Sequence, residues 1–387
     1  MRIANAVLYA LKIPFVESFS HSTKTRTFSD SIIVRLTSED GTVGYGEGVP
    51  RPYVTGETVE TCLDTMKNQL WPAIAQVDYP PITPTQDPLK TMTPIEESLA
   101  ETKTQGVIAW NAARAAFELA LLDCLLKHQK ISFSTILPPK RQMVVYSGVI
   151  TSSSTEKAIQ IAKYLKLFAV KQIKVKIDGH NDKERLMAIR ETVGPEVSLR
   201  VDANGAFEVK QAIGILKEIA EIKLDCIEQP IPRGNSSELA KVKAESPIPI
   251  MVDESLVTVQ DADELISAKA CDFFNLRISK CGGIFRTLEM AKKANDAGIG
   301  LQLGSQVGET AILSAAGRHV AAYLDNLEFV EGSYGTMLLT EDISDEKVNF
   351  GHGGKAPLLR GEGLGTRVRE ETLKKYADKV IECGKVK

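Results

Sequence analysis

Three acidic residues recur along this chain at nearly even spacing, and each one ends a short apolar run. They are Asp202, Glu228 and Asp253, separated by 26 and 25 residues. That interval fits one strand, one helix and two loops, so the three carboxylates are expected side by side at one edge of a sheet. Carboxylates this close repel one another unless a hard cation neutralises them. We therefore predict a Mg²⁺ site, with Mn²⁺ as the alternative ion. The competing interpretation is three solvated loop acids or helix N-caps.

Lysines flank this acidic set. Lys174 and Lys176 lie two residues apart at the end of an apolar run, so their side chains share one face of a strand. Lys280 follows a later run, within Ser-Lys-Cys-Gly-Gly at 279–283. One lysine from each run would bracket a metal-bound ligand from opposite sides. Burial and a nearby cation lower the pKa of a lysine, which suits a general base, whereas the alternative is ordinary surface lysines.

The segments that must position these groups follow a repeating pattern. Short apolar runs alternate with stretches that have the periodicity of amphipathic helices. Eight such units predict an α/β fold with a TIM-type (β/α) barrel of seven or eight strands. An open doubly wound sheet is the alternative. That fold favours a Gly-rich phosphate loop after its first strand, and the residues at 147–149 do not form one. The runs are 144–150, 171–177, 197–202, 224–229, 248–253, 271–277, 299–304 and 327–331.

A different pattern precedes the barrel. We expect an N-terminal α+β capping domain at 1–130, a catalytic barrel at 131–355 and a C-terminal segment at 356–387 that packs back on the cap. A turn at 39–41 joins two of the cap runs and predicts an antiparallel hairpin. The expected strands are 2–14, 28–37 and 42–48, and the expected helices outside the barrel are 58–77, 107–128 and 369–383.

Composition narrows the class of protein. The chain has 387 residues and a net charge of −3, with both signs scattered, so a nucleic-acid partner is not expected. No apolar run approaches the roughly 20 residues of a membrane span, and the N-terminus shows no signal-peptide cleavage site. Six scattered cysteines without a CxxC motif are typical of a cytoplasmic protein with reduced thiols. We also expect a homo-oligomer that acts on a small-molecule substrate.

Five motifs in this order resemble the enolase superfamily, and in particular its muconate-lactonizing (muconate cycloisomerase-like) subgroup. No histidine follows the seventh run, and the Ser-Lys-x-Gly-Gly lysine is present, as in that subgroup. The resemblance covers nearly the whole chain, including segments 44–48, 53–57 and 335–343. The motifs are K-x-K at 174–176, D-A-N at 202–204, I-E-Q-P at 227–230, D-E-S at 253–255 and S-K-C-G-G at 279–283.

The resemblance implies a role for each matching residue. Asp202, Glu228 and Asp253 would bind the metal, while Lys176 and Lys280 would be acid/base groups on opposite faces of the substrate. Supporting roles would fall to Lys174, which orients the substrate carboxylate, and to Asn204 and Glu254, which hold the ligands and the lysine in place. Cap loops near 18–27 and 50–57 would read the substrate, which makes Lys24, Arg26, Tyr53 and Glu331 candidate substrate-binding residues.

The implied reaction is removal of the proton next to a carboxylate, which gives an enediolate that the divalent ion stabilises. An isomerase of this kind would be a racemase, an epimerase or a cycloisomerase. A β-elimination, as in o-succinylbenzoate synthases or acid dehydratases, begins with the same half-reaction. A Schiff-base lysine aldolase and a non-catalytic barrel are alternatives from other classes. The single acid Glu331 departs from the Asp-x-Asp of dipeptide epimerases and argues against a dipeptide substrate. Gly332 stands where muconate cycloisomerases have a glutamate, so the chain departs from that pattern as well.

Overall fold

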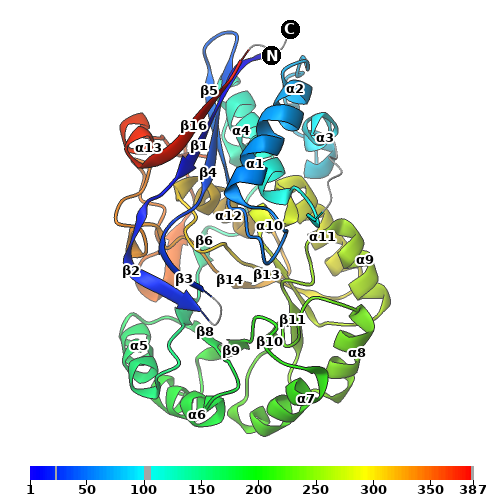
Figure 1. Ribbon diagram of the computed structural model, residues 1–387, viewed down its shortest axis with the longest axis vertical. Helices are drawn as coiled ribbons and strands as arrows, with labels where there is room; N and C mark the ends of the chain where they lie inside the picture. Colours follow the sequence, from blue (N-terminus) through cyan, green and yellow to red (C-terminus); the bar gives the residue numbers. More distant parts are fainter. Residues whose placement is uncertain (22–23, 100–105, 385–387) are drawn as a thin grey trace.

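The computed structural model describes residues 1–21, 24–99 and 106–384, with side chains outside 18–25. It has two parts, an α+β cap and a barrel of parallel strands. In Figure 1 the cap sheet and its helices occupy the upper half, and the ring of strands with its surrounding helices occupies the lower half. The predicted α/β barrel with an N-terminal α+β domain is confirmed.

The cap is built on a four-stranded antiparallel sheet that combines β16 (Ala377–Cys383) with three N-terminal strands, in the order β16-β1-β4-β5. Thr37 pairs with Val43 across the turn, which confirms the predicted hairpin. Strands β2 and β3 form a separate hairpin that reaches down toward the barrel (Figure 1). The N-terminal strands are β1 (Ile3–Leu11), β2 (Pro14–His21), β3 (Lys24–Phe28), β4 (Ile32–Ser38) and β5 (Val43–Gly48).

Helix α4 (Asn111–His128) packs on β5 at a distance that requires glycine. A Cβ atom on Gly46 would lie 2.0 Å from the backbone oxygen of Ala116, and one on Gly48 would lie 2.1 Å from that of Ala112. Alternate glycines of β5 therefore meet alanines spaced four residues apart on the helix. The close approach leaves α4 buried along nearly its whole length. The other cap helices are α1 (Val59–Thr65), α2 (Trp71–Ile74) and α3 (Pro88–Ser98).

The barrel sheet has eight parallel strands in sequence order from β7 to β14. Its register pairs Lys176 with Asp202, and Asp202 with Glu228, so the carboxyl ends of neighbouring strands align. The backbone nitrogen of Ser147 donates to the oxygen of Val330 at 2.8 Å and joins the first strand region to the last. The strands are β7 (Gly148–Ile150), β8 (Gln172–Lys176), β9 (Ser198–Asp202), β10 (Ile227–Glu228), β11 (Ile250–Val252), β12 (Phe273–Leu276), β13 (Gly300–Leu303) and β14 (Leu327–Val330).

Helices connect successive strands and form the outer layer of the barrel (Figure 1). In the part of the chain that the structure describes, no helix has the length and apolar character needed to cross a membrane. The connecting helices are α5 (Thr155–Leu167), α6 (Asp182–Val193), α7 (Val209–Glu218), α8 (Ser236–Glu245), α9 (Val259–Ser267), α10 (Ile278–Cys281), α11 (Ile284–Asp296) and α12 (Ala311–Tyr323).

The C-terminal segment corrects one expectation. The predicted helix 369–383 is helical only in α13 (Glu370–Tyr376), and the rest is strand β16, which pairs antiparallel with β1. Residues 377–383 do not show the apolar and polar alternation of a core strand, because most of their side chains are exposed or half-buried. Their strand conformation comes from the hydrogen-bonded pairing with β1. A short strand, β15 (Lys355–Pro357), pairs with β6 (Met143–Val145) beside the barrel.

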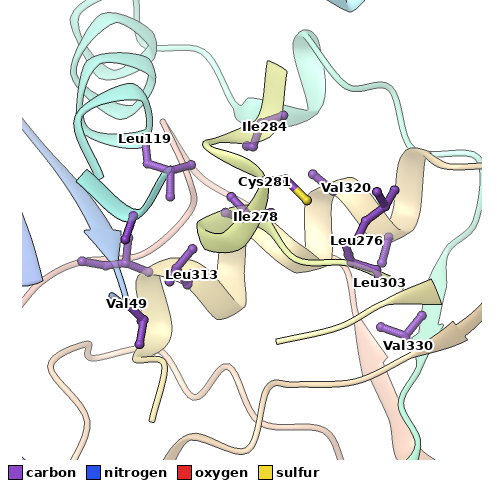
Figure 2. Packing of buried hydrophobic residues seen from close by; sticks show 14 of the residues in the cluster. Val49, Leu119, Leu276, Ile278, Cys281, Ile284, Leu303, Leu313, Val320 and Val330 are labelled. Carbon is purple, nitrogen blue, oxygen red and sulfur yellow. The ribbon is translucent and has the colours of Figure 1, made fainter. Parts of the chain in front are cut away.

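An apolar seam joins the cap to the barrel. Figure 2 shows Val49 from the end of β5 and Leu119 of α4 beside Ile278, Cys281 and Leu313 of the barrel helices. All of these side chains are almost fully buried. Burial of apolar surface on this scale holds the cap over one side of the barrel, so that the cap loops face its mouth.

Candidate active site

A cavity of about 430 Å³ opens at the carboxyl ends of the barrel strands. Its wall combines charged strand-end residues with apolar and small residues of the loops after β13 and β14, and Tyr53 contributes from the cap. In barrels of this type the catalytic groups lie at this end. The charged and amide side chains nearest the strand ends are Lys174, Lys176, Asn204, Gln229, Glu254, Arg277 and Glu331.

The three predicted metal ligands lie on consecutive strands and are completely buried, with exposures of 0% for Asp202, 0% for Glu228 and 1% for Asp253. Each one is paired with cations. Asp202 Oδ2 lies 2.6 Å from Lys176 Nζ and 3.3 Å from Lys174 Nζ. Buried carboxylates without such partners would carry a large desolvation cost.

The other two carboxylates share a guanidinium group. Arg277 Nη2 lies 3.2 Å from Glu228 Oε1 and also forms an ion pair with Asp253 Oδ2. Glu228 further accepts from Lys174 at 3.2 Å, and Asp253 accepts from Lys280 at 2.8 Å. Arg277 therefore joins two of the predicted metal ligands, one on β10 and one after β11.

These pairs set the ionisation of the site. Burial alone would raise the pKa of Glu228, but the charges of Lys174 and Arg277 hold that pKa well below its usual range. Burial would conversely lower the pKa of Lys174, yet Glu228, Glu331 and Asp202 raise it above its ordinary value. Both groups are therefore charged near neutral pH, and Lys174 keeps its proton.

The donor set fits a divalent cation, although cations of the chain contact its members. Within the described residues, no three acidic, histidine or cysteine side chains already surround one point as metal ligands. Glu254 Oε2 is buried and has no hydrogen-bond partner among those residues. Burial and the charges of Asp253 and Asp202 raise the pKa of Glu254 to about 7. Several carboxylate oxygens lie close together here, and one of them has no partner. Such a group suits a hard ion if the Arg277 side chain moves away from Glu228 and Asp253.

Lys176 is the lysine that meets the cavity. Its side chain is 21% exposed, its Nζ atom donates to Asp202 Oδ2, and Asn204 Oδ1 accepts from it at 2.6 Å. The Asn204 amide in turn donates to Glu254 Oε1 at 3.1 Å. Asn204 holds a left-handed backbone conformation, with φ at 45°, which asparagine adopts more readily than most residues other than glycine. The turn places the Asn204 amide between the Lys176 ammonium group and Glu254.

Lys280 does not lie where the sequence placed it. Its side chain is fully buried, and its Nζ atom donates to Asp253 O, Asp253 Oδ1 and Asn275 O at 2.7–2.8 Å. It is absent from the described wall of the cavity, which contains Arg277 instead. The physical reason is α10, a short helical turn that directs Lys280 behind Asp253, whereas Arg277 directly follows β12.

Glu331 lies at the wall but has both oxygens engaged. Lys174 Nζ contacts its Oε2 at 2.6 Å, and Arg200 forms an ion pair with its Oε1. The Arg200 side chain is fully buried on β9. Glu331 therefore orients Lys174 from the last strand and has little capacity left for a substrate group.

The cap candidates divide into two groups. Tyr53 lines the cavity. Arg26 pairs with Asp30 at 2.6 Å and is not part of the described wall. The Lys24 side chain lies outside the described side chains. Sequence reasoning missed Glu309, a wall residue on the loop after β13, where burial raises its pKa to about 8.

Two family models match the chain. An enolase C-terminal domain-like model matches residues 157–372, and the N-terminal domain of mandelate racemase and muconate lactonizing enzyme matches residues 5–137. The chain belongs to the mandelate racemase/muconate lactonizing enzyme family of the enolase superfamily. The resemblance recognised from the five strand-end motifs is thereby confirmed.

Relatives cover nearly the whole of this family member. The chain is 28% identical to an N-succinyl-L-Arg/Lys racemase of Bacillus cereus, over 96% of this chain and 97% of the relative. The crystal structure of N-succinyl Arg/Lys racemase from that species superposes with a TM-score of 0.88, over 99% of this chain and all of that one, at 27% identity.

Two other relatives have different names. A hydrophobic dipeptide epimerase of Enterococcus faecalis is 30% identical over 84% of this chain and 89% of its own length. A muconate cycloisomerase of Rhodococcus opacus is 26% identical over 95% of this chain and 96% of its own. Racemases, epimerases and cycloisomerases are all isomerases. The chain is an isomerase of a family whose enzymes use a divalent metal ion.

Proposed function

We propose that this enzyme uses Mg²⁺ and Lys176 to move a proton at the carbon next to the carboxylate of a small substrate. The observation that carries the proposal is Lys176 Nζ at the cavity wall, 2.6 Å from Asp202 Oδ2, beside two further strand-end carboxylates. A base at that place can reach a carbon whose carboxylate faces the same acids. The product is a racemised, epimerised or cyclised carboxylate.

Asp202, Glu228 and Asp253 would hold the ion. When bound, the ion supplies positive charge next to the substrate carboxylate, where an enediolate carries its negative charge. Release of Arg277 from Glu228 and Asp253 would free its guanidinium group for the same carboxylate, because both acids that it now contacts would turn to the ion.

The other residues of the site would position the reacting groups or enclose the substrate. Lys174 is held by Glu331, Glu228 and Asp202 and contributes a permanent charge beside the substrate carboxylate. Asn204 and Glu254 fix the direction of Lys176. Tyr53 lines the cavity from the cap, where it would reduce the access of water to the reacting carbon.

Proton exchange tests this proposal directly. The protein with Mg²⁺ is incubated in D₂O with N-succinyl-arginine, N-succinyl-lysine, hydrophobic dipeptides and muconate, and proton NMR follows the α-position. We expect exchange or turnover of at least one compound, and a loss of about 10²–10⁴-fold with Lys176→Ala. Lys217→Ala is the matched control, since Lys217 is an exposed lysine of α7. Full turnover by Lys176→Ala would refute the role of Lys176.

We propose further that the protein works in the cytoplasm as a homo-oligomer. Six buried cysteines with free thiols are compatible with a reducing compartment. Sedimentation of the purified chain tests the oligomeric state, and a monomer at micromolar concentration would contradict it.

A further inference from the structure

We infer that protons enter and leave the substrate through one face only, because the cation that faces Lys176 across the cavity is Arg277, a fixed charge, and not a second lysine. This inference rests on the proposed function, since it concerns the same proton at the same carbon. It goes beyond that proposal by naming the direction of transfer and the residue that prevents transfer from the other side.

Lys280 has no capacity for a substrate. An ammonium group has three N–H donors, and Lys280 directs its Nζ atom to three acceptors, two on Asp253 and one on Asn275. The side chain is 1% exposed. To reach the cavity it would have to break all three bonds and leave Asp253 without a partner that is now 2.8 Å away. Lys280 is therefore a positioning residue that holds Asp253.

Arg277 occupies the place that a second base would need. It directly follows β12 and lies on the cavity wall, where Nη1 donates to Gln306 Oε1 at 3.3 Å. Its Nε atom is buried without a hydrogen-bond partner in the part of the chain that is described. A guanidinium group stays protonated throughout the pH range of folded proteins, so Arg277 cannot remove a proton from carbon.

Strand positions put the two groups on opposite sides. Lys176 ends β8 and Arg277 follows β12, with β9, β10 and β11 between them in the sheet. The other lysine of the described wall, Lys174, also belongs to β8 and is held by three carboxylates. Both wall lysines thus approach from one side, and the opposite side presents a guanidinium group that can bind a carboxylate but cannot exchange protons with it.

This arrangement favours one class of reaction. Racemisation needs a proton removed from one face and another delivered to the opposite face. Addition within an unsaturated dicarboxylate needs one proton. A carboxylate oxygen forms a bond to the β-carbon, the electron pair of the double bond moves to the α-carbon and its carboxylate, and Lys176 delivers a proton to the α-carbon. Lys176 then recovers a proton from solvent, so one solvent proton is taken up and the product is an isomer of the singly protonated dicarboxylate.

Lysine labelling tests the placement without a substrate. The folded full chain is treated briefly with acetic anhydride, and peptide mass spectrometry compares each lysine with the same lysine in the unfolded chain. We expect Lys176 to react at least about ten times faster than Lys280, since one is on the wall and the other has every donor engaged. Equal labelling of the two lysines would overturn the inference.

Stereochemistry tests the consequence. The two enantiomers of N-succinyl-arginine are incubated separately in D₂O with the Mg²⁺-loaded enzyme, with Arg277→Lys and with Glu309→Gln. We expect the wild type to exchange the α-proton of one enantiomer only, and Arg277→Lys to raise exchange of the other at least about tenfold. Exchange of both enantiomers by the wild type would overturn the inference. If Glu309→Gln then lost exchange of one of the two enantiomers, Glu309 would be identified as the second base.

The two proposals can fail separately. If the wild type exchanges neither enantiomer nor turns over any other compound of the panel, proton transfer next to a carboxylate is refuted. Lysine labelling then still decides whether Lys280 is accessible from the cavity.

Discussion

Two regions of this molecule bury glutamates and aspartates, and they compensate them in different ways. At the barrel mouth, Asp202, Glu228 and Asp253 are paired with lysine and arginine side chains. At the seam between cap and barrel, Glu47 and Glu118 are paired with backbone N–H groups at the beginnings of helices. A buried carboxylate is therefore one member of an ion pair at the mouth, whereas at the seam it accepts hydrogen bonds that join two elements of the fold.

The seam glutamates each bridge distant parts of the chain. Glu47 of β5 accepts from the backbone nitrogens of Thr310 and Leu313 at 2.8 and 3.0 Å, where α12 begins. Glu118 of α4 accepts from the nitrogen of Phe285 at 2.8 Å, where α11 begins. Burial raises the pKa of Glu47 to about 7 and that of Glu118 to about 8.

The kind of group that pairs with a buried carboxylate therefore indicates what that carboxylate does. Lysine and arginine side chains can rotate to other positions, so the carboxylates of the mouth can exchange these cations for a metal ion. Backbone N–H groups at the beginning of a helix are fixed in place, so the seam carboxylates hold two elements of the fold together. Substitutions in the two regions should consequently separate metal binding from stability.

Asp253→Asn should have the largest effect, and on metal binding. The carboxamide keeps the shape of the side chain but loses the charge that a divalent ion requires. We expect Mg²⁺ affinity, measured by titration calorimetry, to fall at least about 100-fold, while the circular dichroism spectrum stays that of the wild type. Glu47→Gln, in the seam, should bind Mg²⁺ within about twofold of the wild type. Unchanged affinity in Asp253→Asn would contradict the assignment of the ion.

Glu47→Ala should have the next largest effect, and on stability. Removal of this carboxylate leaves the N–H groups of Thr310 and Leu313 buried without their acceptor. We expect the free energy of unfolding to fall by about 2–4 kcal/mol, measured by urea denaturation. Mg²⁺ affinity of the folded variant should not change. A stability equal to that of the wild type would show that Glu47 does not connect the cap to α12.

Glu118 at the seam and Glu228 at the mouth should affect the pH dependence of stability in opposite directions. Glu118 keeps its proton to about pH 8 in the folded chain, but loses it near its ordinary value of 4.5 when unfolded. Between these values the folded state binds more protons, so stability falls as pH rises. Glu228 has a lowered pKa, so its contribution is present above its ordinary value and is lost as pH falls.

Thermal unfolding from about pH 5 to about pH 8.5 measures this slope. The wild type should lose stability across the range, and Glu118→Gln should lose less, by about 1–3 kcal/mol. Equal slopes in the two proteins would show that Glu118 does not take up a proton on folding.

Arg26→Ala should have the smallest effect. Arg26 pairs with Asp30 in a partly exposed position outside the described cavity wall. We expect stability to change by less than about 1 kcal/mol, as for most such ion pairs. The KM for whichever compound is turned over should stay within about twofold. A tenfold rise in KM would restore Arg26 as a substrate-binding residue.

Much of the site followed from one rule applied to the sequence. Asp202 and Glu228 end apolar runs, and parallel register brings such ends together, so their proximity was predictable. Arg277 ends the run 271–277, so the same rule also applies to it, whereas the prediction named Lys280, three residues later. The turn of α10 that hides Lys280 is four residues long and leaves no periodic signal.

The seam was beyond prediction for a different reason. Glu47 and its partner Thr310 are 263 residues apart, and Glu118 and Phe285 are 167 residues apart. Nothing local distinguishes a glutamate that will meet a helix end from one that will meet water. Strand β16 is a similar case, since its order comes from β1 at the other end of the chain.

Strand β16 also has a consequence for how the protein is made. It lies at the outer side of the cap sheet and pairs with β1, so Ala6 and Cys383 are neighbours although the entire barrel separates them along the chain (Figure 1). During synthesis on the ribosome, β1 emerges before the barrel strands, and its partner β16 appears only after all of them. The exposed edge of β1 is a hazard for association with other nascent chains during that interval. Pairing of β16 with β1, and not completion of the barrel, is thus the step that completes the cap sheet.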